Sequence, residues 1–300
     1  MKNNWNVEMT EKHLNDGLRV SELWDLKDLE RKWNETDVLV VPNHVGRRLV
    51  AGFACSDRAV QEALHLRYEV FNVELGHGID ASSVTGLDRD EYDEHMTHLL
   101  LLESETRRIV GTYRLQTVNH ALAHAGIYSA QEYDMSAFSK YFDLAVECGR
   151  ACIAPEYRKA ASLLILWTGL RAFMTLAGKR WMFGCCSISS HEPDDGWRAL
   201  KTIREDGFLD PELFVKATPD FSCGDPAREF DSELGEAIPL PKLFSSYMRL
   251  GARVISEPAI DRAFGTIDFL VLADGLNVNM SKLGLAPPAG GVYVSERLER

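Results

Sequence analysis

The sequence predicts an α/β (α+β) domain in which helices flank a mixed central sheet. Two apolar runs, 98–103 and 108–117, are separated by four polar residues, the pattern of a β-hairpin. A third run, 144–153, leads into a long apolar helix at 160–177 and then into another strand. A hairpin pairs antiparallel strands and a helical crossover joins parallel ones, so we expect both kinds of pairing in one sheet.

A strand and a helix are expected before the hairpin. Residues 48–55 form an apolar run typical of a strand, and Asp57 is a candidate N-cap for a helix at 58–74, where apolar residues recur at helical spacing. Residues 76–93 are rich in Gly, Ser, Asp and Thr and are expected to form a loop. The polar tetrapeptide 104–107 then makes the hairpin turn.

After the hairpin, helices and strands are expected to alternate. Residues 120–139 are mixed and in part helical, and the helix at 160–177 stops at Gly178. The next run, 179–188, is rich in aromatic residues and Cys, which is typical of a strand. The remaining expected elements are a helix at 195–205, a helix at 239–251 that ends at Gly251, and a strand at 264–273.

Three parts are expected along the chain, without internal repeats or low-complexity segments. Residues 1–50 are polar and charged apart from a strand-like run at 38–42, and they form an N-terminal extension that packs on the main domain. The main domain covers 51–275, and residues 276–300 form a loose C-terminal tail.

Composition and charge exclude several classes of protein. The 300 residues carry a net charge of −12, which argues against a surface built to bind nucleic acid. The six Cys form no C-x-x-C motif and no secreted framework, the first ten residues are polar, and the longest apolar run is interrupted by Arg171. We expect a cytoplasmic protein without a membrane span, with peripheral contact at the inner membrane face left open.

The run Glu147-Cys148-Gly149-Arg150 lies inside the strand expected at 144–153. Strand interiors rarely carry charge, and Gly weakens a strand unless a bulge or a close backbone approach requires it. We therefore expect the strand to open at this point and admit a ligand.

Seven short segments occur in an order shared with known acyltransferases. Four resemble the signature of the autoinducer (acyl-homoserine lactone) synthases, a branch of the GNAT acyltransferase fold: LRYEVF at 66–71, DEYD at 90–93, GTYRL at 111–115 and ECGR at 147–150. Three resemble the ornithine N-acyltransferases of ornithine lipid synthesis and the long-chain N-acyl amino acid synthases: 181–187, 241–252 and 258–270. The resemblance covers roughly residues 50–275 and implies a GNAT-like fold and N-acyl transfer from acyl carrier protein thioesters.

The loop before the long helix indicates the form of the acyl donor. GNAT members that use coenzyme A carry an R/Q-x-x-G-x-G/A loop whose backbone N–H groups hold the pyrophosphate. Here the loop reads RKAAS at 158–162, so both glycines are replaced and a diphosphate approaches the backbone less closely. We expect an acyl chain on the phosphopantetheine of acyl carrier protein and no other cofactor. A coenzyme A loop that tolerates Ala is the alternative.

N-acylation needs a base for the amine and N–H donors for the oxyanion. Glu147 is the candidate base, and a structural ion pair with a nearby arginine such as Arg150, Arg114 or Arg67 is the alternative. Backbone N–H groups beside a bulge at Gly149, notably at 151–153, are the candidate oxyanion donors. Gly149 and Arg150 complete the expected catalytic segment.

Further residues are candidates for binding the two substrates. The resemblance implies that Asp90 and Asp93 hold the cationic amine of the acceptor, and simple turn chemistry is the alternative. Arg67 and Arg114 are expected to form a buried network with the carboxylates, with Phe71 on the same substrate side. The expected contacts of the acyl chain and pantetheine are Ala151, Cys152, Ile153, Arg158, Ser162 and Trp181, for which core packing is the alternative at Trp181.

Two other kinds of site are weaker. His95-x-x-His98 with Cys148-x3-Cys152 has the residue types of a zinc site, but we expect no metal because the two His sit at a strand entrance. The Ser-rich run 187–191 suggests a hydrolase, yet no G-x-S-x-G elbow surrounds it.

These expectations combine into an N-acyltransferase that moves a long fatty acyl chain from acyl carrier protein to the α-amine of an amino acid. Ornithine is the leading acceptor, and the product is then lyso-ornithine lipid. The alternatives are another amino acid acceptor, an acyl-homoserine lactone synthase that uses S-adenosylmethionine, and a non-catalytic module that binds acyl chains or acyl carrier protein.

Overall fold

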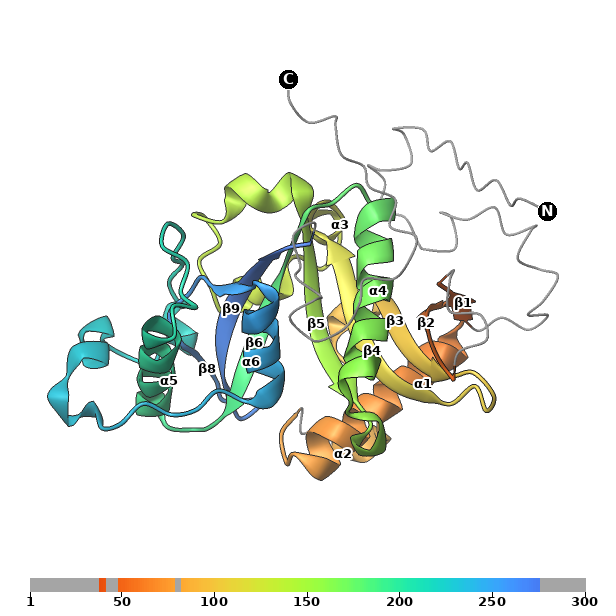
Figure 1. Cartoon of the computed structure of the whole chain (residues 1–300), viewed down its shortest axis with the longest axis horizontal. Helices are drawn as coiled ribbons and strands as arrows, with labels where there is room; N and C mark the ends of the chain where they lie inside the picture. The colour runs from red at the N-terminus through yellow and green to blue at the C-terminus, as the bar shows by residue number, and fades with distance from the viewer. Residues whose placement is uncertain (1–37, 42–47, 79–81, 276–300) are drawn as a thin grey trace, which may run out of the picture.

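The computed structural model describes residues 38–41, 48–78 and 82–275 (Figure 1). Within these residues one nine-stranded sheet has the order β1-β2-β3-β4-β5-β6-β9-β7, and β8 pairs with β9. The strands are β1 Val38–Val40, β2 Leu49–Ala54, β3 Thr97–Glu103, β4 Ile109–Thr117, β5 Ala145–Ile153, β6 Trp181–Ser189, β7 Arg253–Val254, β8 Ala259–Asp261 and β9 Thr266–Asp274. β5 and β6 pair in parallel, and the other paired strands of the described part are antiparallel, which confirms the predicted mixed sheet.

Part of the expected N-terminal extension joins the sheet. β1 pairs with β2 from Val38↔Ala54 to Val40↔Gly52. The boundary expected at residue 50 falls inside β2, and most of the remaining extension lies outside the described residues. The tail expected at 276–300 also lies outside them.

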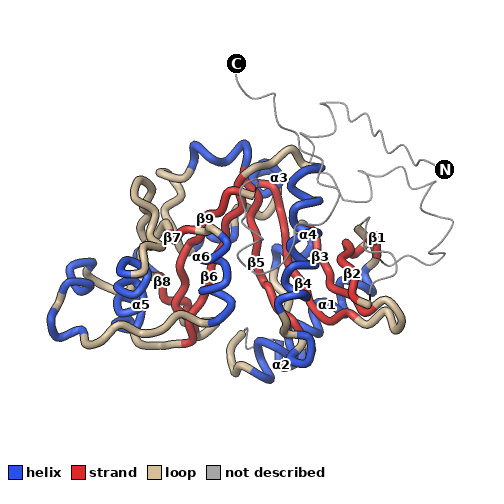
Figure 2. The backbone as a smooth tube through the Cα atoms, viewed as in Figure 1, coloured by secondary structure: helices blue, strands red, loops and turns tan. Residues whose placement is uncertain are grey.

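The helices of the described part pack on the two faces of the sheet (Figures 1 and 2). They are α1 Asp57–Tyr68, α2 Ser82–Thr85, α3 Val118–Ala123, α4 Ala160–Leu176, α5 Pro193–Glu205 and α6 Lys242–Leu250. α4, α5 and α6 bury side chains such as Trp167, Trp197 and Phe244 in one core cluster. α1 buries Ala59 and Ala63 in another cluster, and α3 contributes to a third.

The side chains of β3 show that both faces are covered. Leu99 and Leu101 belong to the cluster that contains α4, whereas Leu100 and Leu102 belong to the cluster of α1. Successive side chains of a strand point to opposite faces, so helices on both sides are needed to keep this continuous leucine run out of water.

The start and end of α1 differ from the prediction. Ser56 is the N-cap, because its hydroxyl accepts a hydrogen bond from the N–H of Ala59, and Asp57 lies in the first turn. The helix does not run to residue 74 as an α-helix: a π-helical segment, Glu69–Glu74, continues it. Both Ser and Asp are good N-caps, so composition alone did not distinguish neighbouring positions.

Other differences concern short elements. The expected loop at 76–93 contains α2, and a 3₁₀ turn, Glu91–Glu94, begins in it. α6 begins at Lys242 rather than at 239, because its N-cap is Pro241 in an extended conformation. β7 and β8 have only two and three residues, too few for a sequence pattern to mark. In the described part, no helix has the length and apolar character that a bilayer span requires.

Candidate functional site

The sheet opens at its centre, between β5 and β6. The two strands pair only from Ala145↔Trp181 to Glu147↔Phe183 and then separate, as Figure 1 shows. At the point of separation Gly184 lies against β5, since a Cβ on this residue would be 1.9 Å from the carbonyl oxygen of Cys148. The opening is therefore wedge-shaped and closes at a tight backbone contact.

A β-bulge in β5 lines this opening. Thr112 of β4 faces Cys152 and Arg114 faces Gly149, so two residues of β5 stand opposite one of β4. Arg150 has a φ of +48°, a left-handed conformation that is uncommon for a residue other than Gly. The strand opens at the expected segment, and its left-handed residue is Arg150.

The backbone of β5 beyond the bulge offers hydrogen-bond donors. The N–H of Ala154 donates to Val110 of β4. Because N–H groups alternate in direction along a strand, the N–H of Ile153 points away from β4, toward the side from which β6 has separated. These donors are of the kind that an oxyanion needs. The thiol of Cys152 is buried, and burial raises its pKa to about 12, so it remains protonated.

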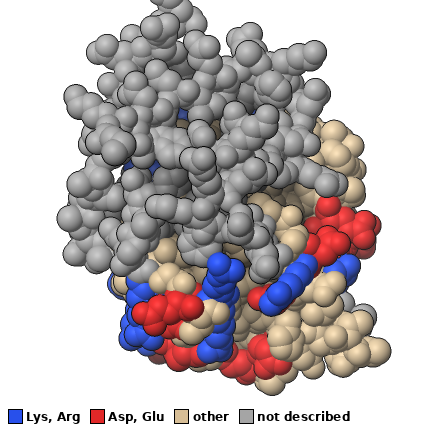
Figure 3. Space-filling model, turned by 90° about the vertical axis from the view of Figure 1, so that its right-hand side faces the viewer, with Lys and Arg blue, Asp and Glu red and all other residues tan. Residues whose placement is uncertain are grey.

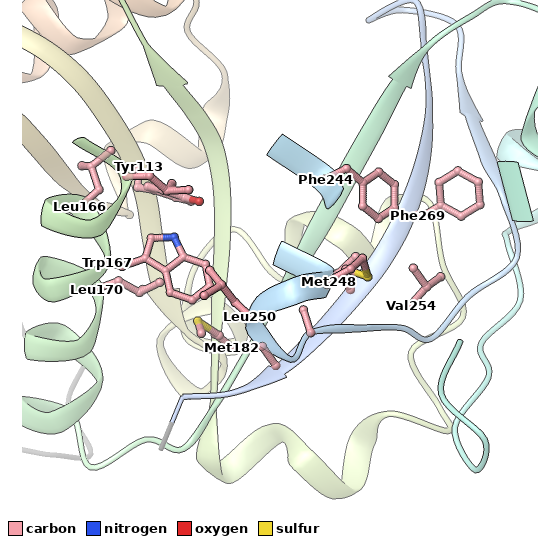
Figure 4. Packing of buried hydrophobic residues seen from close by; sticks show 14 of the residues in the cluster. Tyr113, Leu166, Trp167, Leu170, Met182, Phe244, Met248, Leu250, Val254 and Phe269 are labelled. Atoms are coloured by element: carbon pink, nitrogen blue, oxygen red, sulfur yellow. The ribbon is translucent and has the colours of Figure 1, made fainter. Parts of the chain in front are cut away.

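An apolar pocket lies at the opening, with about 530 Å³ of empty space when the adjoining open solvent is included. It lies under α4 and α6, and Figure 4 shows Tyr113 and Trp167 pointing from β4 and α4 toward α6. The hydroxyl groups of Tyr113 and Tyr247 are hydrogen bonded, and the Trp167 ring stacks on Tyr247 at 5.6 Å. The lining residues are Tyr113, Cys148, Gly149, Arg150, Ala151, Trp167, Leu170, Met182, Phe183, Gly184, Cys185, Cys186, Tyr247, Ala252, Val271 and Ala273.

Trp181, which we expected at the acyl chain, does not line this pocket. Its ring packs edge-on against Tyr141 at 5.1 Å and under the guanidinium of Arg180. Met182 lines the pocket instead. Phe183 and Cys185 share the face of β6 with Trp181 and do line the pocket, whereas Trp181 lies at the end where β6 pairs with β5, away from the opening.

On the other face, three arginines and three aspartates form a buried network. The Arg67 guanidinium donates to Asp93 Oδ1 at 2.6 Å and to Asp88 Oδ1 at 2.7 Å. Arg114 donates to Asp93 at 3.1 Å and also to Asp90. This geometry confirms the expected pairing of Arg67 and Arg114 with carboxylates.

Arg150 completes this network from the bulge. Its guanidinium lies 3.4 Å from an oxygen of Asp88 and 3.4 Å from one of Asp90. The same group stacks over the ring of Phe264 at 4.5 Å, and Phe71 packs edge-on against Phe264 at 5.5 Å. Phe71 thus reaches the site through a second aromatic ring.

Asp90 and Asp93 therefore serve the turn chemistry that was the alternative to amine binding. They form a capping box at the start of the 3₁₀ turn Glu91–Glu94. Burial alone would raise the pKa of Asp93, but the Arg67 and Arg114 guanidinium groups hold it well below its usual range. Both carboxylates already face cations of the protein, so their charge is balanced without a substrate.

Glu147 is also buried and fully engaged. Its Oε1 accepts from the N–H and the hydroxyl of Ser129, each at 2.7 Å, and its Oε2 accepts from Gln116 at 2.7 Å and from the N–H of Tyr128 at 3.0 Å. Four donors fill the positions at which a carboxylate accepts hydrogen bonds. The partners are neutral donors, and not the arginines of the alternative ion pair. Glu147 holds the segment at Tyr128 and Ser129 in place.

The loop before α4 carries an internally paired arginine. Arg158 donates through both terminal nitrogens to the Glu74 carboxylate, at 2.5 and 2.6 Å, and through Nε to the carbonyl of Ile153 at 2.8 Å. The side chain of Ser162 is buried within the helix start. Neither side chain projects freely toward a ligand at the N-terminus of α4.

Sequence reasoning missed one polar cluster on the face opposite α4. Glu132, Cys185 of β6 and Asp268 of β9 each place a side-chain atom within 4.8 Å of the other two. Cys185 also lines the pocket, so the cluster adjoins the opening. The available signal was Asp268 itself, an acid between Ile267 and Phe269 in an apolar strand.

The zinc grouping considered from the sequence does not form in the described part of the chain. The ring of His98 contacts the backbone carbonyl of Asp93 at 3.1 Å, and His95 lies against His124. Cys148 lines the pocket. In the run 187–191, the Ser189 hydroxyl contacts His77 at 2.8 Å.

Comparisons with known proteins agree with the motifs. The family model of the acetyltransferase (GNAT) domain matches residues 66–168. The L-ornithine N(alpha)-acyltransferase of Agrobacterium fabrum is 32% identical over 237 residues, which cover 73% of this chain and 78% of that protein. The protein of the same name from Brucella abortus is 32% identical over 230 residues, which cover 73% of this chain and 82% of that protein. The predicted resemblance and the GNAT fold are thus confirmed.

Solved structures with a similar arrangement include two synthases. The AHL synthase LasI matches 83% of this chain and 98% of its own at a TM-score of 0.45 and 12% identity. FeeM, an N-acyl amino acid synthase from uncultured soil microbes, matches 79% of this chain and 97% of its own at a TM-score of 0.46 and 12% identity.

Proposed function

The chain belongs to the family of the L-ornithine N(alpha)-acyltransferases, and from this premise we propose that it transfers a long fatty acyl chain from acyl carrier protein to the α-amine of ornithine. The product is then lyso-ornithine lipid. One observation carries the proposal: the opening between β5 and β6 connects an apolar pocket on the α4 face with a polar, charged face on the other side. The acyl chain of a thioester needs the apolar pocket, and an amino acid needs the polar, charged face.

The opening provides the parts of a direct transfer. The acyl chain occupies the apolar pocket, with the thioester carbonyl at the bulge in β5. The acceptor amine attacks the carbonyl carbon, the tetrahedral oxyanion takes hydrogen bonds from backbone N–H groups near Ile153, and the C–S bond then breaks. The acceptor reacts as the free amine, after its ammonium has given one proton to the solvent. On attack the amine loses a second proton and the leaving thiolate gains one, so charge balances over the reaction.

The form of the donor is supported by the loop before α4. Without glycines, and with Arg158 bound to Glu74, this loop offers neither close backbone approach nor a free guanidinium to a pyrophosphate. Acyl carrier protein presents phosphopantetheine without that diphosphate. Charges of both signs lie side by side on the described part of one face (Figure 3).

Initial rates with palmitoyl-acyl carrier protein and palmitoyl-coenzyme A test the donor. We expect a higher kcat/KM with the carrier protein thioester. A higher kcat/KM with the coenzyme A ester would contradict the proposed donor while leaving acyl transfer intact.

A panel of amino acids, with S-adenosylmethionine as a further acceptor, tests the rest of the proposal by mass spectrometry of the products. We expect N-acyl ornithine as the main product. An acyl-homoserine lactone would support the synthase alternative. Acyl carrier protein that binds without turnover for any acceptor would support a non-catalytic binding module.

A further inference from the structure

Two acidic side chains are buried beside the opening without a basic partner. Glu132 follows the 3₁₀ turn Tyr128–Gln131, and Asp268 lies on β9. Their exposed fractions are 1% and 5%, and a carboxylate oxygen of each lies within 4.8 Å of the other and of the Cys185 sulfur. In the described part of the chain, no Lys, Arg or His forms an ion pair with either acid.

Burying two acids without a basic partner is energetically unfavourable for the folded protein. Burial and the nearby charges of Asp268 and Asp261 raise the pKa of Glu132 well above its usual range. Burial and the charge of Asp261 raise the pKa of Asp268 to about 6, against hydrogen bonds from Ser187 and Glu132 that lower it. Asp88 and Asp93 are equally buried, but the guanidinium groups of Arg67, Arg114 and Arg150 balance their charge. The contrast shows that this fold supplies buried acids with cations elsewhere and leaves this pair without one.

A second observation points to a missing partner. The Oδ1 of Asp268 is buried and has no hydrogen-bond donor within the described residues. Buried polar atoms in native proteins are almost always paired with protein groups, water or a ligand. Because the Asp268 carboxylate forms one side of the cluster, its unpaired oxygen marks a place for a donor from outside the protein.

The cluster also has the right position relative to the opening. Cys185 belongs to both the cluster and the pocket lining, where it stands beside Gly149 and Arg150. An amino acid whose α-amine enters the opening thus has its side chain within reach of the two acids. In ornithine, three methylene groups separate the α-carbon from the terminal nitrogen, and that nitrogen is a cation near pH 7.

We propose that Glu132 and Asp268 form the subsite that binds the side-chain ammonium group of the acceptor, and so select a diamino acid over a neutral one. This inference rests on the proposed function, since it assigns the acceptor side of the same opening. An ammonium group brings three donors and one positive charge, which the two carboxylates match. The thiol of Cys185 lies beside the two acids, and burial and Glu132 raise its pKa well above the usual range.

Steady-state kinetics with ornithine and 2-aminopentanoic acid test the subsite, because the second compound has the same carbon chain without the terminal amine. In Glu132→Gln and Asp268→Asn we expect kcat/KM for ornithine to fall about 10- to 100-fold, the cost of a lost charge-assisted hydrogen bond, with little change for 2-aminopentanoic acid. Glu205→Gln, at an exposed acid on α5, is the matched control and should change neither value. An equal fall for both substrates would overturn the inference and assign the acids a role in folding or chemistry.

Calorimetric binding to the full chain separates this inference from the proposed function. We expect ornithine to bind the wild type more tightly than 2-aminopentanoic acid, and the two variants to lose the difference. If the wild type binds ornithine in this way but acylates no amino acid, the proposed function fails and the cation subsite stands. If it acylates both compounds equally well and binds them equally, the function stands and the subsite fails.

Two controls complete the test. Each variant replaces a buried acid that has no basic partner with a neutral amide of the same shape, so the melting temperature should stay the same or rise, and a fall in both variants would contradict the electrostatic basis of the inference. Titration with Mn²⁺ and Zn²⁺ is the second control. Tight metal binding that both variants abolish, with an unchanged preference for ornithine, would overturn the ammonium subsite in favour of a metal site.

Discussion

The buried carboxylates around the opening have three different electrostatic environments. Asp93 faces two guanidinium groups, Glu147 accepts from four neutral donors, and Glu132 with Asp268 faces no cation within the described residues. A buried carboxylate that is fully hydrogen bonded stabilises the structure around it, whereas one without partners tends to take up a proton or a cation. These environments, and not the residue type, separate supporting acids from candidates for binding.

Glu147 provides the first prediction. Glu147→Gln turns an acceptor-only group into an amide whose NH₂ must face donors, so we expect the free energy of unfolding to fall by about 1.5–3 kcal/mol. The pH profile of kcat should keep its shape, because a supporting residue does not set the protonation state of the amine. Urea unfolding and rates from pH 6 to 9 measure the two effects.

The opposite result would restore Glu147 as the base. For Glu147→Gln, that result would be an unchanged free energy of unfolding, a fall in kcat of about 10²-fold or more, and loss of the acidic limb of the pH profile of kcat. Glu205→Gln serves again as the control for a change of charge at an exposed acid.

His98 gives a prediction for pH. Burial lowers the pKa of His98 from 6.5 to about 4, so the unfolded chain binds more protons than the folded chain between these values. Stability from this residue is therefore present above pH 6.5 and is lost as the pH falls toward 4, by up to about 3 kcal/mol at 1.36 kcal/mol per pKa unit. Unfolding of the wild type and His98→Gln between pH 4 and 8 should show their stabilities converging toward low pH. A difference that is constant with pH would contradict the neutral, buried imidazole.

Residue roles were predictable only where the sequence itself shows a conflict. Arg67 and Arg114 are charges in apolar elements, which indicates that acids must lie nearby, and the structure confirms it. The pair formed by Glu132 and Asp268 was not predictable, because 136 positions of sequence separate two residues that only the closed sheet brings together. The role of Glu147 depends on donors from the segment at Tyr128, which sequence patterns describe poorly.

At the scale of elements, the fold depends on how β5 and β6 separate. A bulge in β5 and the end of pairing after Glu147 create the opening. The hydrophobic patterns predicted the long strands and α4 within a few residues, because apolar periodicity extends over their full length. The exact position of the bulge and the two-residue β7 depend on pairing with distant strands, which no local pattern contains.

Two glycines at the opening give a matched pair of predictions. A Cβ on Gly184 would lie 1.9 Å from the Cys148 carbonyl oxygen, so Gly184→Ala forces β5 and β6 apart and should destabilise the fold by about 1–3 kcal/mol. A Cβ on Gly149 meets nothing within 4 Å, so Gly149→Ala should change stability by less than about 0.5 kcal/mol or raise it slightly. Urea unfolding of both variants measures the difference. Equal effects would show that the tight contact at Gly184 does not set the geometry of the opening.

At the scale of the whole molecule, the sheet separates two approaches to one opening. The apolar pocket lies under α4 and α6, and the acid pair lies on the other face, where Glu132 and Cys185 meet. In the reaction that we propose, donor and acceptor enter from opposite faces and occupy the opening at the same time. A covalent intermediate on the enzyme is not needed by this geometry, since the amine reaches the thioester directly.

The cysteines near the opening support the same conclusion. Burial raises the pKa of Cys148 and Cys186 well above the usual range, and that of Cys185 still further with the help of Glu132. Only a thiolate is an effective nucleophile, so none of these protonated thiols is prepared to accept the acyl group.

Kinetics of the intact enzyme test this two-sided arrangement. Double-reciprocal plots with both substrates varied should intersect, as a ternary complex requires, and intact-protein mass spectrometry with acyl donor alone should show no acyl adduct. Cys148→Ala, which removes a thiol that lines the pocket, should keep kcat within about tenfold, whereas loss of a true nucleophile costs several powers of ten. Parallel lines together with an adduct on Cys148 would show a ping-pong route, and the acyl group would then visit the protein before the amine arrives.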